Sequence, residues 1–153
     1  MLDAIDRRIL AILQADARTA NAEIARQVGL VPSAVLERIR RLEKQGVVQG
    51  YTARLAPKAV GLGLAAFVAV RTQERAEVME VVRQLAKFPE VLEVHYVAGE
   101  DCILLKARAA DTEDLSRLLR ERFGKIRGIV STRSTVVLES IKETSELPIK
   151  EQE

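Results

Sequence analysis

Apolar residues in the first part of the chain recur with the 3.6-residue period of an α-helix. They form three stripes that are separated by polar residues. The stripes are Ile5, Ile9, Ile12 and Leu13, then Ile24, Ala25 and Val28, and then Val35, Ile39 and Leu42. The pattern predicts three amphipathic helices that pack their apolar sides together, with the first helix behind the other two.

Residue types at the ends of these stripes predict where the helices begin and end. Asp3 and Asn21 are typical N-caps for the first and second helices. Gly29 suits the left-handed residue that ends a helix. Pro32 suits a first helical turn, because its missing N–H would have no partner there. Residues 21–45 are therefore predicted to form a helix-turn-helix.

The third helix is expected to read DNA, because its outward face is small at its start and cationic at its end. The residues on or beside that face are Ser33, Ala34, Glu37, Arg38, Arg40, Arg41 and Lys44. The first three are expected to approach base edges, and the four cations to contact phosphates or guanine edges. The alternative is a basic face that is only solvated, since many such helices never meet nucleic acid.

The charge is distributed unevenly along the chain. Residues 1–60 contain ten lysines and arginines against six acidic residues, whereas residues 61–153 contain fourteen against sixteen. The basic character therefore belongs to the N-terminal part. This is expected for a DNA-binding module joined to a module that does not bind DNA.

The rest of the chain predicts a second domain. Residues 47–55 predict a short strand that contains Gly50, and residues 56–63, with Pro57, Gly61 and Gly63, predict a hinge. The six elements that follow are a strand at 65–72, a helix at 76–88, strands at 91–99 and 102–109, a helix at 112–123 and a strand at 128–140. This order is that of the ferredoxin-like βαββαβ fold, in which two helices cover one face of an antiparallel sheet.

The other face of this sheet is also expected to be apolar. The expectation rests on five residues that, with their neighbours, make the strands apolar on both sides: Val68, Val70, Val94, Leu104 and Val136. Dimerisation through that face is expected, because a large apolar surface is usually covered. The chain is then an α+β protein with a three-helix, winged-type helix-turn-helix domain at 1–50, a strand and hinge linker at 51–63, a ferredoxin-like sandwich at 64–142 and a mobile tail at 143–153.

Composition favours a cytoplasmic protein without a membrane partner. Apolar residues make up 48% of the chain, but runs such as 63–70 are far shorter than the roughly 20 residues that cross a membrane. The opening MLDAIDRR does not resemble a secretory signal. Cys102 is the only cysteine, so no intrachain disulfide is possible, which fits a reducing compartment.

The pattern does not predict a catalytic or metal site. His95 is the only histidine, so the chain offers few ligands for a metal cluster and few partners for a His-based triad. A packed or interfacial role is therefore expected for His95. Cys102 is expected to be structural, because the neighbouring acids disfavour a reactive thiolate. No phosphate-binding loop or nucleophile elbow occurs, so neither a cofactor nor an enzymatic activity is expected.

Four segments resemble the Lrp/AsnC family of bacterial and archaeal transcription regulators, the feast/famine proteins. The segments are LDAIDRRILAILQADART, NAEIARQVGL, SAVLERIRRLEKQGVVQGY and VAGEDCILLKA. The resemblance covers nearly the whole chain. It implies a DNA-binding domain, a hinge, and an effector domain that pairs through its sheet into dimers, which often associate into tetramers or octamers. It also implies a small effector, usually an amino acid, held between effector domains near the glycine turn.

The effector-binding residues that the resemblance implies are Gly99, Glu100, Asp101, Cys102, Thr132 and Ser134. Two positions depart from the family's pattern. Val31 stands where a serine usually caps the recognition helix, a loss of about 1 kcal/mol unless Ser33 or a neighbour substitutes. Cys102 stands where an aspartate is frequent, with Asp101 one residue earlier. Asp101 and its neighbour could hold a ligand's ammonium group or serve only as turn residues, and both interpretations stay open.

Three functions are consistent with the sequence. The first is a sequence-specific transcriptional regulator that binds double-stranded DNA and responds to a small effector, expected to be an amino acid. The second is an architectural or ligand-sensing assembly protein that binds DNA with little sequence preference. The third is an enzyme similar to the siroheme decarboxylases, which use a similar two-domain layout. The single histidine and the basic helix argue against the enzyme.

Overall fold

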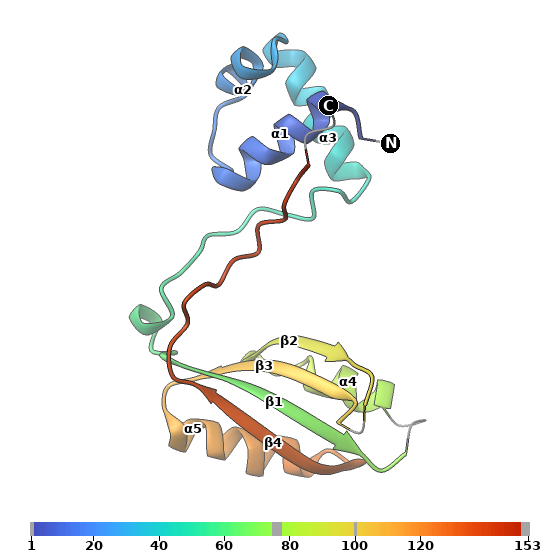
Figure 1. Cartoon of the computed structure of the whole chain (residues 1–153), viewed down its shortest axis with the longest axis vertical. Coiled ribbons are helices and arrows are strands. Elements are labelled where there is room, and N and C mark those ends of the chain that lie inside the picture. Colours follow the sequence, from blue (N-terminus) through green and yellow to red (C-terminus); the bar gives the residue numbers. More distant parts are fainter. Residues whose placement is uncertain (1, 75–77, 100, 151–153) are drawn as a thin grey trace. The chain divides into compact units, whose positions relative to one another are not determined.

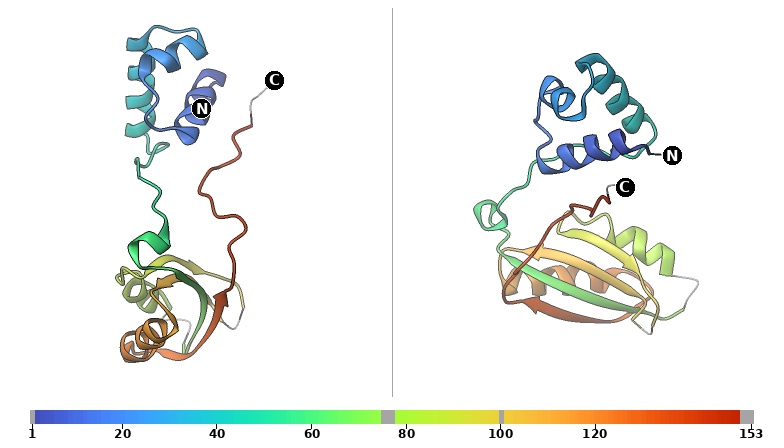
Figure 2. Two further views of the ribbon diagram at one scale, coloured as in Figure 1. Left: turned by 90° about the vertical axis from the view of Figure 1, so that its left-hand side faces the viewer. Right: turned by 45° about the horizontal axis from the view of Figure 1, so that its top comes forward.

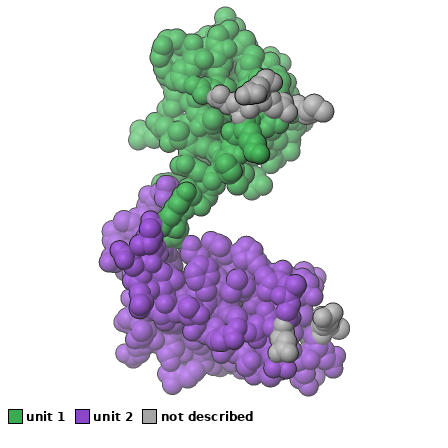
Figure 3. Space-filling model, viewed as in Figure 1, with its two compact units in different colours: residues 1–53, 142–153 green, residues 54–141 purple. Residues whose placement is uncertain are grey.

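The computed structural model of the chain describes residues 2–74, 78–99 and 101–150. The chain divides into two compact units, which Figure 3 distinguishes by colour. Unit 1 consists of residues 1–53 and 142–153, and unit 2 consists of residues 54–141. Each unit has a hydrophobic core of its own. No helix in the described part of the chain is both long enough and apolar enough to cross a membrane.

Unit 1 contains three helices, labelled in Figure 1. They are α1 (Ala4–Ala15), α2 (Asn21–Val28) and α3 (Pro32–Lys44). The predicted apolar stripes meet between them and form a core in which the most buried members are Ile9, Ile24, Ala25, Val35 and Ile39. The prediction of three helices packed through their apolar sides is confirmed, because each stripe becomes one wall of this core.

The helix ends agree with the sequence at most positions. Asp3 caps α1 as predicted, and it forms a reciprocal capping box with Asp6. Gly29 ends α2 in a left-handed conformation with φ 70°. The prediction for Asn21 is wrong, because α2 already begins at this residue and Ala20 occupies the cap position without a side-chain hydrogen bond. Pro32 is the first residue of α3, as expected.

The short strand predicted at 47–55 does not form. Residues 47 and 48 lie in a bend, residues 49–55 have no regular structure, and a short 3-10 helix, Pro57–Val60, lies within the predicted hinge. An isolated extended segment with strand-forming residues is not stable as a strand, because backbone pairing needs a neighbour. Gly46, with φ 70°, ends α3 in a Schellman-type turn in which the Val47 N–H reaches the Leu42 carbonyl at 2.9 Å.

Unit 2 has the predicted strand, helix, strand, strand, helix, strand order. Its elements are β1 (Leu64–Thr72), α4 (Val78–Leu85), β2 (Val91–Tyr96), β3 (Ile103–Ala109), α5 (Thr112–Arg117) and β4 (Ile129–Val137). The strands pair antiparallel in the order β2-β3-β1-β4. The chain continues after α5 as a π-helical turn (Leu118–Arg122) and a 3-10 turn. The helix predicted at 76–88 corresponds to α4, and its predicted first residue, residue 76, lies outside the described residues.

Both helices lie on the same face of the sheet (Figures 1 and 2). Val78, Val81 and Leu85 of α4 join Leu118 and Phe123 in one buried cluster with the strand residues that face them. These strand residues are Val68, Val70, Ile103, Leu105 and Ala107. The predicted ferredoxin-like sandwich is therefore confirmed.

The uncovered face of the sheet is less apolar than expected. Val68 and Val70 are fully buried on the helix side, and the register places Val94 and Val136 on that side too. Of the five residues from which strands apolar on both sides are expected, Leu104 is on the uncovered face and the other four are on the helix side, because side chains alternate along each strand. This surface, the open face, is formed by Phe67, Ala69, Glu93, His95, Leu104, Lys106, Arg133 and Thr135.

Residues 142–150 contain neither a helix nor a strand. Within unit 1, the side-chain amide of Gln14 exchanges two hydrogen bonds with the backbone of Leu147, at 2.8 and 3.0 Å. The mobility expected for the tail stays a prediction.

The capping box of α1 predicts a dependence of stability on pH. A hydrogen bond from Arg38 at 2.6 Å, followed by one from the Asp6 backbone, lowers the pKa of Asp3 below its usual 3.8. A carboxyl whose pKa is lowered by folding stabilises the protein above its unfolded pKa, and this stabilisation disappears as the pH falls through the folded value. We therefore expect the urea midpoint of the wild type to exceed that of Asp3→Asn at neutral pH.

The difference between the two proteins is expected to shrink as the pH is lowered from about 5 towards 3, because protonation gives wild-type Asp3 the same lack of charge. Asparagine can still cap the helix, so the comparison isolates the charge. A difference that stays constant over this range would contradict the role of the Asp3 carboxylate.

Candidate functional site

The outward face of α3 is exposed as predicted. Ser33, Glu37, Arg40 and Lys44 are exposed, and Ala34 is partly buried. Within the described residues, Arg40 and Lys44 have no hydrogen bond or ion pair with the protein. They lie four positions apart, so their side chains project from neighbouring points on one side of the helix. The C-terminal half of this face therefore presents two cations that solvent or a ligand can reach.

Arg38 and Arg41 point to a different side of α3, where they meet the first turn of α1. The Arg41 guanidinium donates to both carboxylate oxygens of Asp6, at 2.7 and 2.8 Å. Arg38 donates to Asp6 at 2.8 Å and to Asp3 at 2.6 Å. The Asp6 side chain is only 2% exposed. The sequence predicts DNA contacts for these two arginines, and the structure gives both of them carboxylate partners within the protein.

The start of α3 has no side-chain cap. Val31 occupies the cap position, and neither Ser33 nor a neighbour substitutes for the missing hydroxyl. The Ala34 and Val35 amides bond to the Val31 carbonyl instead, at 3.1 and 3.2 Å. The missing cap expected from the sequence is therefore not replaced.

Cations elsewhere on the helix-turn-helix are partly neutralised. Arg26 of α2 donates to Glu23 at 2.6 and 3.0 Å, and Gln27 donates to the same carboxylate at 2.8 Å. The hydrogen bond from Arg26, followed by that from Gln27, lowers the pKa of Glu23 from 4.5 to about 2. The pair thus stays charged at neutral pH, and α2 adds little net positive charge beside α3.

Three of the predicted effector residues, Gly99, Asp101 and Cys102, lie at one end of the sheet in unit 2. Gly99 has φ 131°, which favours glycine, and lies in the turn between β2 and β3. Cys102 follows the turn, is buried, and has its sulfur 3.5 Å from the Thr72 hydroxyl. Glu100 lies outside the described residues. The structural role expected for Cys102 agrees with this buried position.

The strand register brings β4 to the same end of the sheet. Val70 of β1 lies between Ile103 of β3 and Thr132 of β4. A hydrogen bond joins the turn between β2 and β3 directly to β4: the Asp101 carboxylate accepts it from Arg133 at 2.6 Å. Arg133 lies between Thr132 and Ser134, and the sequence pattern does not single it out. No local signal could have found it, because the contact depends on how the strands are ordered.

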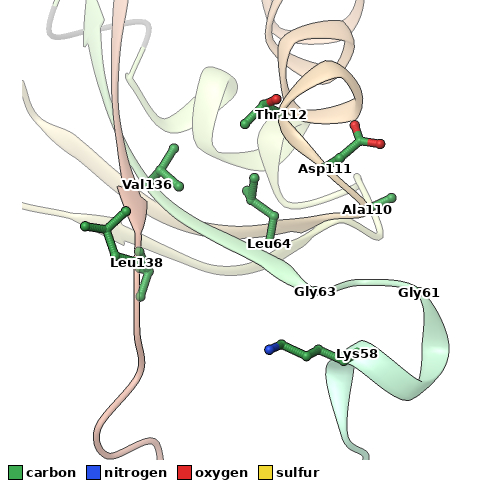
Figure 4. Close-up of a pocket in the computed structure, with 10 residues that line it drawn as sticks. Lys58, Gly61, Gly63, Leu64, Ala110, Asp111, Thr112, Val136 and Leu138 are labelled. Atoms are coloured by element: carbon green, nitrogen blue, oxygen red, sulfur yellow. The ribbon is translucent and has the colours of Figure 1, made fainter.

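A shallow groove of about 590 Å³ lies at the opposite end of the sheet (Figure 4). Its lining includes Lys58, Leu64, Asp111 and Val136. Asp111 is already engaged as the N-cap of α5. The groove is open to solvent and contains none of the predicted effector residues, so its size alone does not make it the effector site. No pattern in the sequence indicates it.

His95 is exposed on the open face, with its ring 3.4 Å from the Glu93 carboxylate. The described residues contain no group of three or more histidine, cysteine, aspartate or glutamate side chains placed to hold a metal ion.

Comparison with protein families gives two matches that together span most of the chain. Residues 2–49 match a winged helix-turn-helix DNA-binding domain, and residues 65–147 match the Lrp/AsnC ligand-binding domain. The first match contains α1, α2 and α3, and the second contains nearly the whole sheet of unit 2.

Individual relatives match along nearly their whole length. The chain is 42% identical to the leucine-responsive regulatory protein of Escherichia coli over 151 residues, which cover 97% of this chain and 92% of the relative. It is 39% identical to the HTH-type transcriptional regulator FL11 of Pyrococcus horikoshii over 149 residues, which cover 97% of each protein.

Solved structures show the same fold over the full chain. A feast or famine regulatory protein of M. tuberculosis complexed with L-methionine has a TM-score of 0.90 and 39% identity, covering 98% of this chain and all of the other. A transcriptional regulator of Neisseria meningitidis in complex with L-Met also has a TM-score of 0.90, with 35% identity and 97% coverage of each chain. The chain therefore belongs to the Lrp/AsnC family of transcriptional regulators, which are DNA-binding proteins with a ligand-binding domain and not enzymes.

Proposed function

We propose that this regulator acts in the cytoplasm as a sequence-specific DNA-binding protein and reads base edges with Ser33, Ala34 and Glu37. The observation that supports this proposal is the outward face of α3, where small side chains precede two cations that have no partner among the described residues. A helix of this kind can enter the major groove with its first turns, while the later cations meet phosphates. Arg40 and Lys44 supply these phosphate contacts, whereas Arg38 and Arg41 are held by carboxylates in the structure.

The protein forms a homodimer through the open face of unit 2. Phe67 is 40% exposed on a central strand, beside Ala69 and Leu104. Charges of both signs surround this apolar centre, including Glu93 and Lys106, which lie 3.6 Å apart. A mixed surface of this kind can pair with a second copy of itself about a two-fold axis. Two recognition helices would then read half-sites about one helical turn apart, or a multiple of it.

The effector is an amino acid that binds beside the turn that contains Gly99, with Cys102 next to this turn and Thr132 and Ser134 on β4. Two solved relatives are named as complexes with L-methionine, which supports this ligand class. The Asp101 carboxylate and the Arg133 guanidinium lie together there, 2.6 Å apart. An amino acid carries the complementary ammonium and carboxylate groups, so the two side chains can each bind one end of it.

Effector binding regulates the protein by shifting its assembly from dimers towards tetramers or octamers, or in the reverse direction. The ligand can do this only if it binds the alternative assemblies with different affinities.

The DNA-binding proposal is tested with DNA from upstream of the protein's own gene and with a scrambled sequence. For Arg40→Ala, we expect weaker binding to both DNAs and a slope of log Kobs against log salt concentration that is shallower by about 0.9 for each phosphate that the variant no longer neutralises. Arg83→Ala is the matched control, because Arg83 pairs with Glu80 in unit 2. A slope unchanged by Arg40→Ala would contradict the assignment, and equal wild-type affinity for both DNAs would favour an architectural protein.

The dimer proposal is tested by Phe67→Asp. A charge at the apolar centre cannot be buried in the interface without a large desolvation cost, so we expect the mass measured by light scattering to fall towards that of the 17.0 kDa single chain. Leu138→Asp is the control, because Leu138 is 98% exposed and lies outside the open face. A mass that the Phe67 variant does not change would place the interface elsewhere.

The effector proposal is tested by Asp101→Asn, with Asp111→Asn as the control. If Asp101 binds the ammonium group, we expect the amino acid concentration that shifts DNA binding and assembly size to rise about tenfold or more. If Asp101 is only a turn residue, asparagine serves equally well and the required concentration stays the same. The second result would contradict the proposal.

A further inference from the structure

Asp6 is the most deeply buried acid in the described part of the chain, with 1% of the residue exposed. It lies in the first turn of α1, whereas both of its guanidinium partners, Arg38 and Arg41, come from the middle and end of α3. The contact therefore joins segments that are 32 and 35 residues apart in the sequence. A buried carboxylate of this kind is stable only while its charged partners stay in place.

The cations of α3 are divided between two sides of the helix. Arg38 and Arg41 are three positions apart and face α1, where Asp3 and Asp6 neutralise them. Arg40 precedes Arg41 by one residue, which turns it by about 100° around the helix axis and away from these acids. The same contacts that hold Arg38 and Arg41 against α1 therefore fix the rotation at which the other side of α3 faces outward.

We propose that Asp6 is a positioning residue for DNA recognition, and that Arg38 and Arg41 hold α3 in its reading orientation instead of neutralising phosphates. The proposal rests on the proposed role of α3 as the DNA-reading helix. It extends that role to a residue that lies on another helix and is buried from solvent. It also assigns two of the four cations on α3 to the carboxylates of Asp3 and Asp6 and leaves the other two to DNA.

The guanidinium geometry supports this division. One nitrogen of Arg41 contacts both oxygens of Asp6, and Arg38 bridges Asp6 and Asp3 through a single nitrogen. The two oxygens of Asp6 thus accept three charge-assisted hydrogen bonds from α3, which leaves little freedom for the helix to rotate. If both arginines left for phosphates, the buried Asp6 would lose all three of these hydrogen bonds, which is strongly unfavourable.

The test measures salt slopes on the upstream and scrambled DNAs for single variants. We expect Arg41→Ala to keep the wild-type slope, in contrast to Arg40→Ala, because Arg41 releases no counterions from DNA. Asp6 keeps Arg38 in the Arg41 variant, so unit 1 retains a paired carboxylate and is expected to fold. Circular dichroism checks this directly. A slope for Arg41→Ala as shallow as that for Arg40→Ala would overturn the proposal.

A second variant tests positioning. Asp6→Asn is expected to lower the ratio of upstream to scrambled affinity by about tenfold or more without weakening binding to scrambled DNA, because the released arginines can then meet phosphates. Asp16→Asn, an exposed acid on the other end of α1, is the charge-matched control and is expected to keep the wild-type ratio. An unchanged ratio in a folded Asp6 variant would overturn the proposal, whereas a wild type that binds no DNA at any salt concentration would contradict the proposed function itself.

Discussion

The buried carboxylate of Asp6 is the contact on which the arrangement of unit 1 depends. Three short helices enclose a small apolar core, and a core of this size is marginal without further contacts. Asp6, in the first turn of α1, adds ion pairs with two arginines of α3. Because these arginines are paired with acids of α1, the cations of α3 without a partner among the described residues are the ones on its other side. The pairing of Asp6 with Arg38 and Arg41 thus contributes to the stability of unit 1 and also decides which cations of α3 face outward.

In unit 2, side chains alternate along each strand between the buried face and the open face of the sheet. One set of side chains fills the core against α4 and α5, and the other set forms the open face. The central position of β1 brings the turn after β2 close to β4, so Asp101 and Arg133 meet. The proposed dimer surface and the proposed effector residues therefore belong to one sheet. A ligand that prefers one assembly can change that assembly through this shared scaffold.

Membership of the Lrp/AsnC family establishes the class of protein, while the details that differ from family expectation belong to this chain. Val31 leaves α3 without a side-chain cap, although Pro32 still begins the helix and Val35 and Ile39 bury its inner face. Cys102, which stands where the family frequently has an aspartate, is buried beside Thr72. The acid that the structure describes in this turn is Asp101, which pairs with Arg133. These residues give the proposed effector site a charge arrangement of its own.

The sequence by itself determined the three helices, their glycine and proline boundaries, the Asp3 cap and the βαββαβ order, because periodicity and capping depend on residues close together in the chain. It did not determine which side of the sheet Val94 and Val136 face, since a register fixes this only after the strands pair. It also predicted a strand at 47–55 that has no partner. Only the tertiary structure decided that Arg38 and Arg41 meet Asp6, and that Arg133 meets Asp101. Such contacts join residues more than thirty positions apart, and their geometry exists only after the helices and strands have packed.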